Sequence, residues 1–344
     1  MRLTLLIPEL IWPEPNDQLA LGKLSLPGFE WLAARASFTR QDKVAFETAL
    51  ARQFDLNDAA FGPLRLLGEP IGEAAREGHW LCADPVHLRF HHERIILADA
   101  GAFDIDEAEA HSLAADLNET FADIGCLHVV TARRWYLRLN EWVDHPAAPL
   151  SAMAGRRLDG ELSGQNSPLT RWLNEVQMFL HGHPVNEQRQ AEGKPAINSL
   201  WLWGSGPLAA LPTPPWSAVW SSNPLATGLA RAANVPAEPL PGGLSELLDR
   251  AQGDRQLVVL DDLLPPVLYE DSEGWRTAWQ RLDTDWFAPL QGAAGRSLET
   301  LTIVAPTIYG LLTWTVHGKD RWKFWRKSRP LDLIAKELAE GKTA

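Results

Sequence analysis

Short apolar runs predict buried strands at four places along the chain. Runs rich in Leu, Ile, Val and Trp occupy residues 3–7, 199–203, 257–260 and 301–304. Runs that stay apolar at nearly every position are typical of strands buried on both faces of a parallel sheet. Helical spacing of apolar residues lies between them, for example over 225–233 and 274–290. This alternation predicts an α/β core in which helices flank a mostly parallel sheet.

In the middle of the chain, apolar residues recur at every second position. Apolar and polar residues alternate over 86–91 and again over 134–139, and a return strand is expected at 95–97. The polar positions of the two alternating segments are His87, Arg89, His91, Arg134, Tyr136 and Arg138. Alternation with period two is typical of strands with one solvated face, and the first segment with its return strand predicts a hairpin. With a helical pattern over 105–121, these strands predict a small α+β insert.

These patterns divide the chain into three parts. The predicted core comprises residues 1–75 and 165–330, the insert comprises 76–164, and a C-terminal helix lies within 331–344. Ser167 followed by Pro168 predicts a helix start, because a hydroxyl caps a helix and proline fits its first position. Pro184 predicts the end of that helix, because the residue before a proline disfavours the helical conformation.

Composition and charge narrow the class of protein. The chain has 344 residues, of which 45% are hydrophobic and 22% charged, which excludes a disordered or fibrous protein. The net charge of −12 disfavours wrapping of duplex DNA. Residues 319–329 carry six basic side chains and one acid, interleaved with aromatic rings. This tail suits contact with an anionic membrane surface, a single-stranded nucleic acid or an acidic protein, and its folding back on the acidic body is the competing interpretation.

The cysteines and the apolar stretches predict a cytoplasmic location. Cys82 and Cys126 stand alone, without the close spacing of zinc sites or redox pairs. The first residues lack the apolar region of a signal peptide, because Pro8 and Glu9 interrupt the run. The longest uncharged apolar stretch, 302–316, is shorter than the roughly 20 residues that a membrane span needs.

The densest group of polar residues follows the helix that begins after Ser167. It comprises His181, His183, Asn186, Arg189 and Asn198, together with the segments His183-Pro184-Val185-Asn186, Gly193-Lys194-Pro195 and Gly204-Ser205-Gly206. On these residues the chain resembles the RpfE-type bacterial regulatory proteins and, behind them, the archaeal-type cofactor-independent phosphoglycerate mutases of the alkaline phosphatase superfamily. The resemblance implies an alkaline-phosphatase-like core with the small insert closing over it.

The mutase resemblance also implies two metal ions that activate a serine nucleophile, held by Asp and His side chains. The matching strand ends depart from that pattern. An Asp-Gly is replaced by Pro8-Glu9, a set of the Asp-x-x-Gly-His kind by Asp261-Asp262, and an Asp-His by the run from Val304 to Tyr309. Residues 184–316 contain no histidine. We therefore expect no metal cofactor, and the alternative is a Mn or Zn ion held by Glu9, His181, Asp261 and Asp262.

Each group of candidate residues has a structural alternative. Asp261 and Asp262 could cap a helix or lie in a solvated loop. His181 and His183 could be hydrogen-bonded loop residues, with Asn186, Arg189 and Asn198 bracing the turn. The six polar residues of the alternating strands could form a cationic platform for a phosphate or carboxylate, or an ordinary solvated sheet face.

The resemblance, together with these departures from the mutase pattern, implies a regulatory, catalytically degenerate protein of the phosphoglycerate mutase type. It would bind a small phosphorylated or carboxylate ligand between core and insert, and a protein partner is also compatible with the regulatory role. The alternative is an active metal-dependent phosphoglycerate mutase or phosphohydrolase with a rearranged site.

Overall fold

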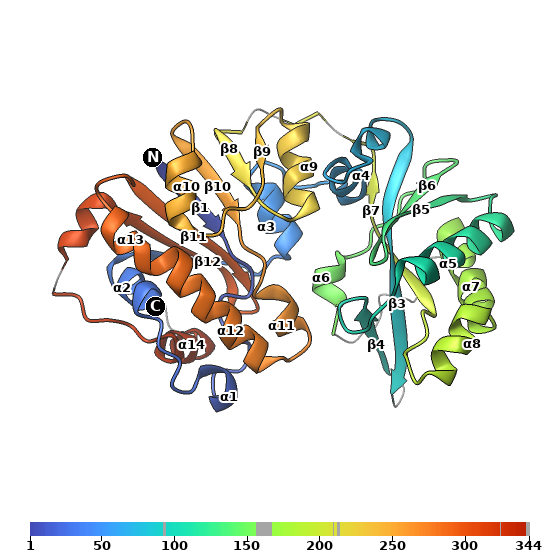
Figure 1. Ribbon diagram of the computed structural model, residues 1–344, viewed down its shortest axis with the longest axis horizontal. Helices are drawn as coiled ribbons and strands as arrows, with labels where there is room; N and C mark the ends of the chain where they lie inside the picture. The colour runs from blue at the N-terminus through green and yellow to red at the C-terminus, as the bar shows by residue number, and fades with distance from the viewer. Residues whose placement is uncertain (92–93, 156–166, 209, 212–213, 324, 342–344) are drawn as a thin grey trace. The chain divides into compact units, whose positions relative to one another are not determined.

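The computed structural model describes residues 1–344 apart from 92–93, 156–166, 209, 212–213, 324 and 342–344 (Figure 1). The chain forms two compact units. Unit 1 comprises Met1–Asp55 and Pro212–Ala344, and unit 2 comprises Leu56–Leu211. Each unit has its own sheet.

Unit 1 contains a seven-stranded sheet with the order β2-β12-β11-β1-β10-β8-β9. The strands are β1 (Arg2–Leu6), β2 (Ser37–Gln41), β8 (Ala218–Trp220), β9 (Ala237–Glu238), β10 (Arg255–Val259), β11 (Thr300–Thr307) and β12 (Gly310–His317). Pairing is parallel from β11 through β1, β10 and β8 to β9, and antiparallel between β11, β12 and β2. The structure therefore confirms a mixed α/β core with a mostly parallel sheet.

Nine α-helices accompany this sheet in the described part of unit 1. They are α1 (Gln18–Leu21), α2 (Pro27–Arg35), α3 (Phe46–Arg52), α9 (Pro224–Ala232), α10 (Leu244–Arg250), α11 (Leu264–Leu268), α12 (Ser272–Leu282), α13 (Ala288–Ala293) and α14 (Leu331–Ala339). Helix α14 begins directly after Pro330, as the sequence predicts. Helices α12 and α13 cross in front of the sheet in Figure 1. The fully buried rings of Trp275 and Trp279, both in α12, belong to the same core as Leu5 at the centre of the sheet.

Two tryptophans of α12 hold the chain that leaves β1. The indole Nε1 of Trp275 donates to the carbonyl of Glu9 (3.1 Å), and that of Trp279 donates to the carbonyl of Leu10 (3.0 Å). Buried indole N–H groups need such partners, and here they are backbone carbonyls. The segment after β1 is therefore fixed at the carboxyl end of the sheet.

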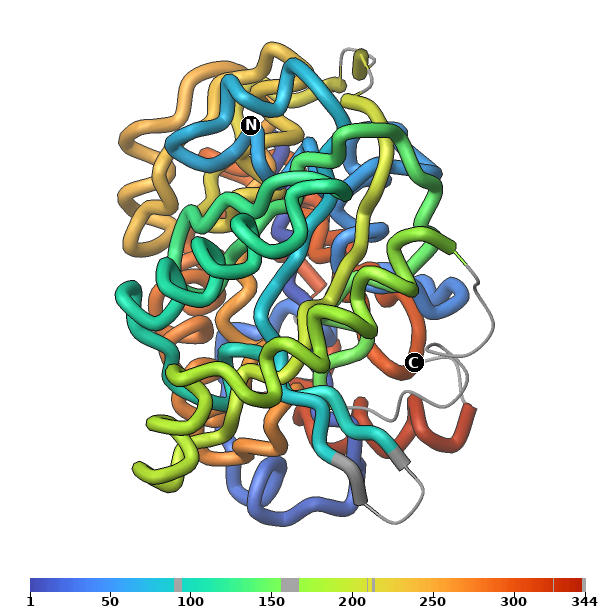
Figure 2. The backbone as a smooth tube through the Cα atoms, turned by 90° about the vertical axis from the view of Figure 1, so that its right-hand side faces the viewer, coloured from blue at the N-terminus to red at the C-terminus, as the bar shows by residue number. Residues whose placement is uncertain are grey.

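Unit 2 contains a five-stranded antiparallel sheet. Its strands are β3 (His79–His91), β4 (Arg94–Asp99), β5 (Gly125–Thr131), β6 (Arg134–Leu139) and β7 (Ser199–Gly206). The long strand β3 pairs with β4, β6 and β7, and its trace runs beside that of β7 in Figure 2. The predicted hairpin is confirmed as β3 and β4.

The described helices of unit 2 lie before and between its strands. They are α4 (Phe61–Leu67), the 3-10 helix η1 (Gly72–Arg76), α5 (Glu107–Thr120), α6 (Leu150–Met153), α7 (Pro168–His181) and α8 (Pro184–Ala191). Ser167 caps α7 as predicted, with its hydroxyl accepting from the amide of Thr170 at 3.1 Å. Pro184 follows the end of α7 and also begins α8, with His183 as the capping residue, so the sequence prediction missed α8.

The units divide the chain differently from the predicted core and insert. We expected an insert of 76–164, whereas the second unit extends from Leu56 to Leu211 and includes α7, α8 and β7. Strand β7 was assigned to the core because its run is apolar at every position from Leu200 to Trp203. In the structure it pairs antiparallel with β3 and contacts α4 and α7, so both of its faces are covered inside unit 2. None of the described helices is long and apolar enough to cross a membrane.

Candidate functional site

The carboxyl ends of the parallel strands bring several polar residues to one edge of unit 1. Glu9 follows β1, Asp261 and Asp262 follow β10, and Asn223 follows β8. Glu9 is buried and has left-handed backbone geometry with φ 54°. In open α/β sheets, ligands bind at this edge. The edge is therefore the first place to test for the metal-dependent chemistry that the mutase resemblance implies.

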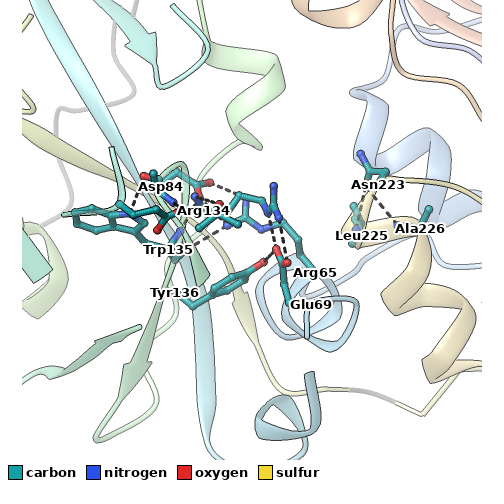
Figure 3. Close-up of polar contacts among 12 residues, drawn as sticks. Arg65, Glu69, Asp84, Arg134, Trp135, Tyr136, Asn223, Leu225 and Ala226 are labelled. Carbon is teal, nitrogen blue, oxygen red and sulfur yellow. Dashed lines mark hydrogen bonds and ion pairs between the residues drawn. The ribbon is translucent and has the colours of Figure 1, made fainter. Parts of the chain in front are cut away.

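Asp261 is tied to the start of a neighbouring helix. The Asn223 amide donates to the Asp261 carboxylate at 2.7 Å, and its oxygen accepts from the amides of Leu225 (2.9 Å) and Ala226 (3.4 Å). Figure 3 shows these last two contacts at the beginning of α9. Asn223 thus caps α9 and holds Asp261 at the same time. This arrangement supports the structural alternative for Asp261.

The environment of Asp261 disfavours its charged form. Burial is the largest effect and raises the pKa of this carboxyl above its ordinary value, and the neighbouring charge of Asp262 adds to the rise. The hydrogen bond from Asn223 opposes it. Asp262 itself is exposed. A metal ligand must be ionised, so the pKa of Asp261 is shifted in the direction that hinders metal binding.

The donor set at this edge does not fit a pair of divalent ions of the mutase kind. Among the residues that the structure describes, no three His, Cys, Asp or Glu side chains form a group that could hold a metal ion. His181, the imidazole of the alternative metal set, belongs to unit 2, whereas Glu9, Asp261 and Asp262 belong to unit 1. The segments that directly follow β10 and β11 contain no histidine that could supply the imidazole ligands of the mutase pattern.

The turn after β11 replaces the Asp-His pair of the mutase pattern. The Thr307 hydroxyl donates to the carbonyl of Gly310 (3.0 Å) and accepts from the amide of Tyr309 (3.1 Å). The Tyr309 hydroxyl donates to the carbonyl of Pro13 at 2.6 Å. These side chains close the turn between β11 and β12 and fix the loop after β1. The hydroxyl groups of Thr307 and Tyr309 therefore form hydrogen bonds with the backbone of unit 1.

A hollow of about 770 Å³ lies beside the end of β10, with walls from α11, α12 and the segment before α10. Leu260, Leu263, Leu282 and Trp286 supply buried apolar walls. Its charged lining residues are Asp262, Asp271, Glu273, Asp285 and Arg281. Four carboxylates against one guanidinium repel phosphates and carboxylates. This hollow does not suit the small anion that the sequence analysis predicts.

The predicted cationic platform does not form. Strand β6 pairs with the first residues of β3, and in this register Arg138 is opposite Trp80 and Tyr136 is opposite Cys82. His87, Arg89 and His91 lie farther along β3, in the part of the strand that pairs with β4. Their backbone partners there are Ala98, Ile96 and Arg94. The step of five residues from Cys82 to His87 spans roughly 17 Å of extended strand. The structure therefore separates the two groups, and the His87 ring nitrogen Nδ1 bonds the carbonyl of Ala196 at 2.7 Å instead.

Two of the three predicted residues on β6 belong to a network of ion pairs on one sheet face (Figure 3). Arg134 donates to both carboxylate oxygens of Glu69 (2.6 and 3.2 Å), and the Tyr136 hydroxyl donates to the same side chain (3.0 Å). Arg65 forms a bidentate pair with Asp84 at 2.8 and 2.7 Å. The alternation predicted that Tyr136 points to solvent. It is fully buried, because Arg65 of α4 stacks on its ring at 4.7 Å.

Arg65, Glu69 and Asp84 were missed by the sequence analysis. The signal was present, because Asp84 interrupts the apolar sequence of β3 and Arg65 lies among the leucines of α4. Charged residues within buried elements are normally paired. Asp84 also accepts from the indole of Trp203 at 2.9 Å, so the network joins α4, β3, β6 and β7.

The polar group that follows α7 braces the chain between α7 and β7. Asn186, which is fully buried, donates to the carbonyls of Leu180 (2.8 Å) and Ile197 (2.9 Å) and accepts from the amide of Ile197 (2.8 Å). Asn198 makes the same paired contacts with the backbone of Leu88 (2.7 and 2.9 Å). These amides join neighbouring segments through backbone bonds.

Arg189 and His183 make further bonds within unit 2. Arg189 donates to the Glu109 carboxylate (2.6 Å) and to the carbonyls of Pro195 and Asp104 (2.8 Å each). His183 is buried, and its Nε2 lies 2.8 Å from the Asp116 carboxylate. His181, by contrast, is exposed at the end of α7. These contacts are the structural bracing that the sequence analysis weighed against ligand binding.

Comparison with known proteins gives a partial relationship to one class of enzyme. No protein-family model matches the chain. Over 147 residues it is 30% identical to the 2,3-bisphosphoglycerate-independent phosphoglycerate mutase of Methanosarcina mazei. It is 29% identical to that of Methanosarcina barkeri over the same length. The aligned part covers 39% of this chain and 36% of each mutase, so the homology is weak and partial.

One solved structure extends the likeness in fold over nearly the whole chain. The PH0037 protein from Pyrococcus horikoshii matches with a TM-score of 0.53 at 16% identity, covering 98% of this chain and 97% of that protein. The cofactor-independent phosphoglycerate mutase from Thermoplasma acidophilum matches with a TM-score of 0.43 at 15% identity, covering 99% and 98%. The likeness to the Pyrococcus protein shows a shared fold.

Proposed function

We propose that this protein is a regulatory relative of the cofactor-independent phosphoglycerate mutases that has lost their metal-dependent catalysis. The observation that carries the proposal is the chemistry at the carboxyl edge of the parallel sheet. There, Asp261 is bound by an amide, the pKa of its carboxyl is raised by burial, and Thr307 and Tyr309 make backbone bonds. Phosphoryl transfer with two metal ions needs ionised ligands that converge on both ions.

The regulatory role draws on the resemblance to the RpfE-type proteins around His183 to Asn186. A protein that keeps an enzyme's scaffold can act by binding in place of catalysis, since function depends on the site and not on the fold. The anion site between core and insert stays a prediction. The lining of the hollow beside β10 is acidic, so we expect the anion to bind elsewhere than in that hollow.

A turnover assay tests the loss of catalysis. The full chain, loaded with Mn²⁺ or Zn²⁺, is incubated with 3-phosphoglycerate, and formation of 2-phosphoglycerate is followed with the Methanosarcina mazei mutase as positive control. We expect no more 2-phosphoglycerate than forms from 3-phosphoglycerate with the metal ion alone. Turnover that disappears in Asp261→Asn or Glu9→Gln would overturn the proposal and establish the alternative, an active enzyme with a rearranged site.

A further inference from the structure

The basic aromatic tail lies between β12 and α14, and the structure fixes it at several points. The amide of His317 donates to the Asp320 carboxylate at 2.8 Å, which starts the 3-10 helix η3 (Gly318–Trp322). Farther along, the Ser328 hydroxyl donates to Glu30 at 2.8 Å, and Arg329 forms an ion pair with Glu337 of α14. We call residues 318–323 and 325–329 the tail surface; Phe324 lies outside the described residues.

Part of the tail surface folds back on unit 1, as the competing interpretation of the sequence predicts. Lys323 is the clearest case, because its ammonium group bonds Asp320 (3.0 Å) and the carbonyl of Arg35 (3.2 Å). Lys319, Arg326 and Lys327, however, are exposed and form no ion pair with any described residue. A surplus of positive charge therefore faces solvent.

Two exposed tryptophans accompany these cations. Trp322 is 65% exposed and Trp325 is 66% exposed, whereas Trp275, Trp279 and Trp314 of the same unit are almost completely buried. The Arg321 guanidinium lies 4.8 Å from the centre of the Trp322 ring. Large exposed apolar side chains beside charged ones are typical of interaction surfaces.

An open groove of about 630 Å³ adjoins the tail surface. Its lining includes Arg296, His317, Lys319, Arg321 and Trp322, with Glu299 as its carboxylate. Glu299 lies 3.3 Å from Arg2, which offsets its charge. The groove extends the positive surface beside Lys319, Arg321 and the exposed ring of Trp322.

We propose that the tail surface docks the protein on an anionic lipid bilayer. Indole rings favour the interface between lipid and water, and neighbouring Lys and Arg side chains are attracted to anionic headgroups. The tail carries a charge of +5 and the whole chain −12, so the remainder carries −17 and is repelled by the same membrane. The contact is therefore confined to this segment, peripheral and sensitive to salt.

A membrane explains this surface better than a nucleic acid does. Affinity for nucleic acid rises with the number of phosphates that are neutralised, and here three cations are exposed and unpaired among the described residues of the tail. The exposed apolar rings would gain free energy in a bilayer interface without a defined stacking geometry. Arg321 already covers part of the Trp322 ring, which leaves less of it for a base.

Vesicle flotation tests the proposal on the full chain. Vesicles of phosphatidylcholine with 30% phosphatidylglycerol are compared with vesicles of phosphatidylcholine alone, at low and high salt. We expect binding to the anionic vesicles and its loss at high salt. The triple variant Lys319→Glu/Arg326→Glu/Lys327→Glu should lower the partition coefficient at least about a hundredfold, and the double variant Trp322→Ala/Trp325→Ala about tenfold.

Matched variants on unit 2 serve as controls. Trp142 is 53% exposed and Arg171 is exposed, so Trp142→Ala and Arg171→Glu should leave partition within about twofold. All the substituted residues are exposed, and unchanged thermal unfolding shows that each variant is folded. Absence of binding to anionic vesicles would overturn the proposal. So would tighter binding to a single-stranded oligonucleotide than to vesicles, lost in the same tail variants, because that result assigns the surface to nucleic acid.

Discussion

The side-chain amide of Asn223 donates a hydrogen bond of 2.7 Å to the carboxylate of Asp261 across two neighbouring strand ends. The two residues are 38 positions apart in the chain. This bond occupies a carboxylate at the position where the mutase resemblance implies a metal ligand, and it couples that carboxylate to the first turn of α9. The edge of the sheet is therefore stabilised by local hydrogen bonds.

Removing the charge of Asp261 should stabilise the fold at neutral pH. Burial raises the folded-state pKa of this carboxyl, so ionisation costs free energy above that pKa, and the cost disappears as the pH falls through it. Asp261→Asn keeps an acceptor for Asn223, and we expect a higher free energy of unfolding at pH 7.5 with a smaller gain at pH 5. Urea unfolding at both pH values measures this.

Two variants complete that test. Asn223→Ala removes the cap of α9 and should lower the free energy of unfolding by about 1–2 kcal/mol. Asp262→Asn changes an exposed carboxylate and should stay within about 0.5 kcal/mol of the parent. Destabilisation by Asp261→Asn at pH 7.5 would contradict this account of the sheet edge.

The buried pair of Arg65 and Asp84 should be costly to break. Asp84→Ala leaves the guanidinium without its bidentate partner and the Trp203 indole without its acceptor, so we expect a loss of about 3–5 kcal/mol. The exposed pair of Arg76 and Glu73 is the control, and Glu73→Gln should cost less than about 1 kcal/mol. Chemical unfolding monitored by tryptophan fluorescence compares them. Similar losses in both variants would show that the network in Figure 3 is not a stabilising core.

Asn186 should matter for stability through its backbone bonds. Asn186→Ala leaves buried groups of Leu180 and Ile197 without partners, and a loss of about 2–4 kcal/mol is expected. Gln188 on the same helix is exposed, and Gln188→Ala should change the free energy of unfolding by less than about 0.5 kcal/mol. Thermal unfolding provides the comparison. An Asn186→Ala variant as stable as the parent would speak against the bracing role.

The imidazole of His128 should respond to Arg138. Burial is the main cause that lowers the pKa of His128, and the positive charge of Arg138 lowers it further. Arg138→Gln should therefore raise this pKa part of the way towards its ordinary value. An NMR titration of the imidazole protons, assigned with His128→Gln, gives the shift. Because the folded-state pKa is lowered, the contribution of His128 to stability is lost as the pH falls below its unfolded-state pKa, and this loss should be smaller in the variant.

The sequence predicts those parts of the fold that depend on local patterns. The strand at residues 3–7, the cap at Ser167 and the helix after Pro330 all follow from residues close together in the chain, and the structure confirms them. Pairing between distant strands could not be predicted in the same way. The run from Leu200 to Trp203 is apolar because helices cover both faces of β7, which gives the same pattern as a strand of a parallel sheet.

For the candidate site residues, too, contacts between segments that are distant in sequence could not be predicted from local patterns. Alternation on β6 predicted that Tyr136 points to solvent, but α4, which is distant in sequence from β6, covers that face. The contact between Asn223 and Asp261 also depends on the order of strands in the sheet and on no local spacing. The bracing role of Asn186 and Arg189 was weighed correctly beside a ligand role, because buried amide and guanidinium groups near a turn commonly bond the backbone.

The number of metal ions bound per chain tests directly whether the protein has lost the metal-dependent catalysis of the mutases. The full chain is dialysed against Mn²⁺ and, separately, Zn²⁺, freed of unbound metal, and analysed by mass spectrometry for bound ions per chain. We expect no stoichiometric pair of ions in the parent, and the same result for Asp261→Asn. Two ions per chain in the parent, reduced in Asp261→Asn or Glu9→Gln, would contradict it.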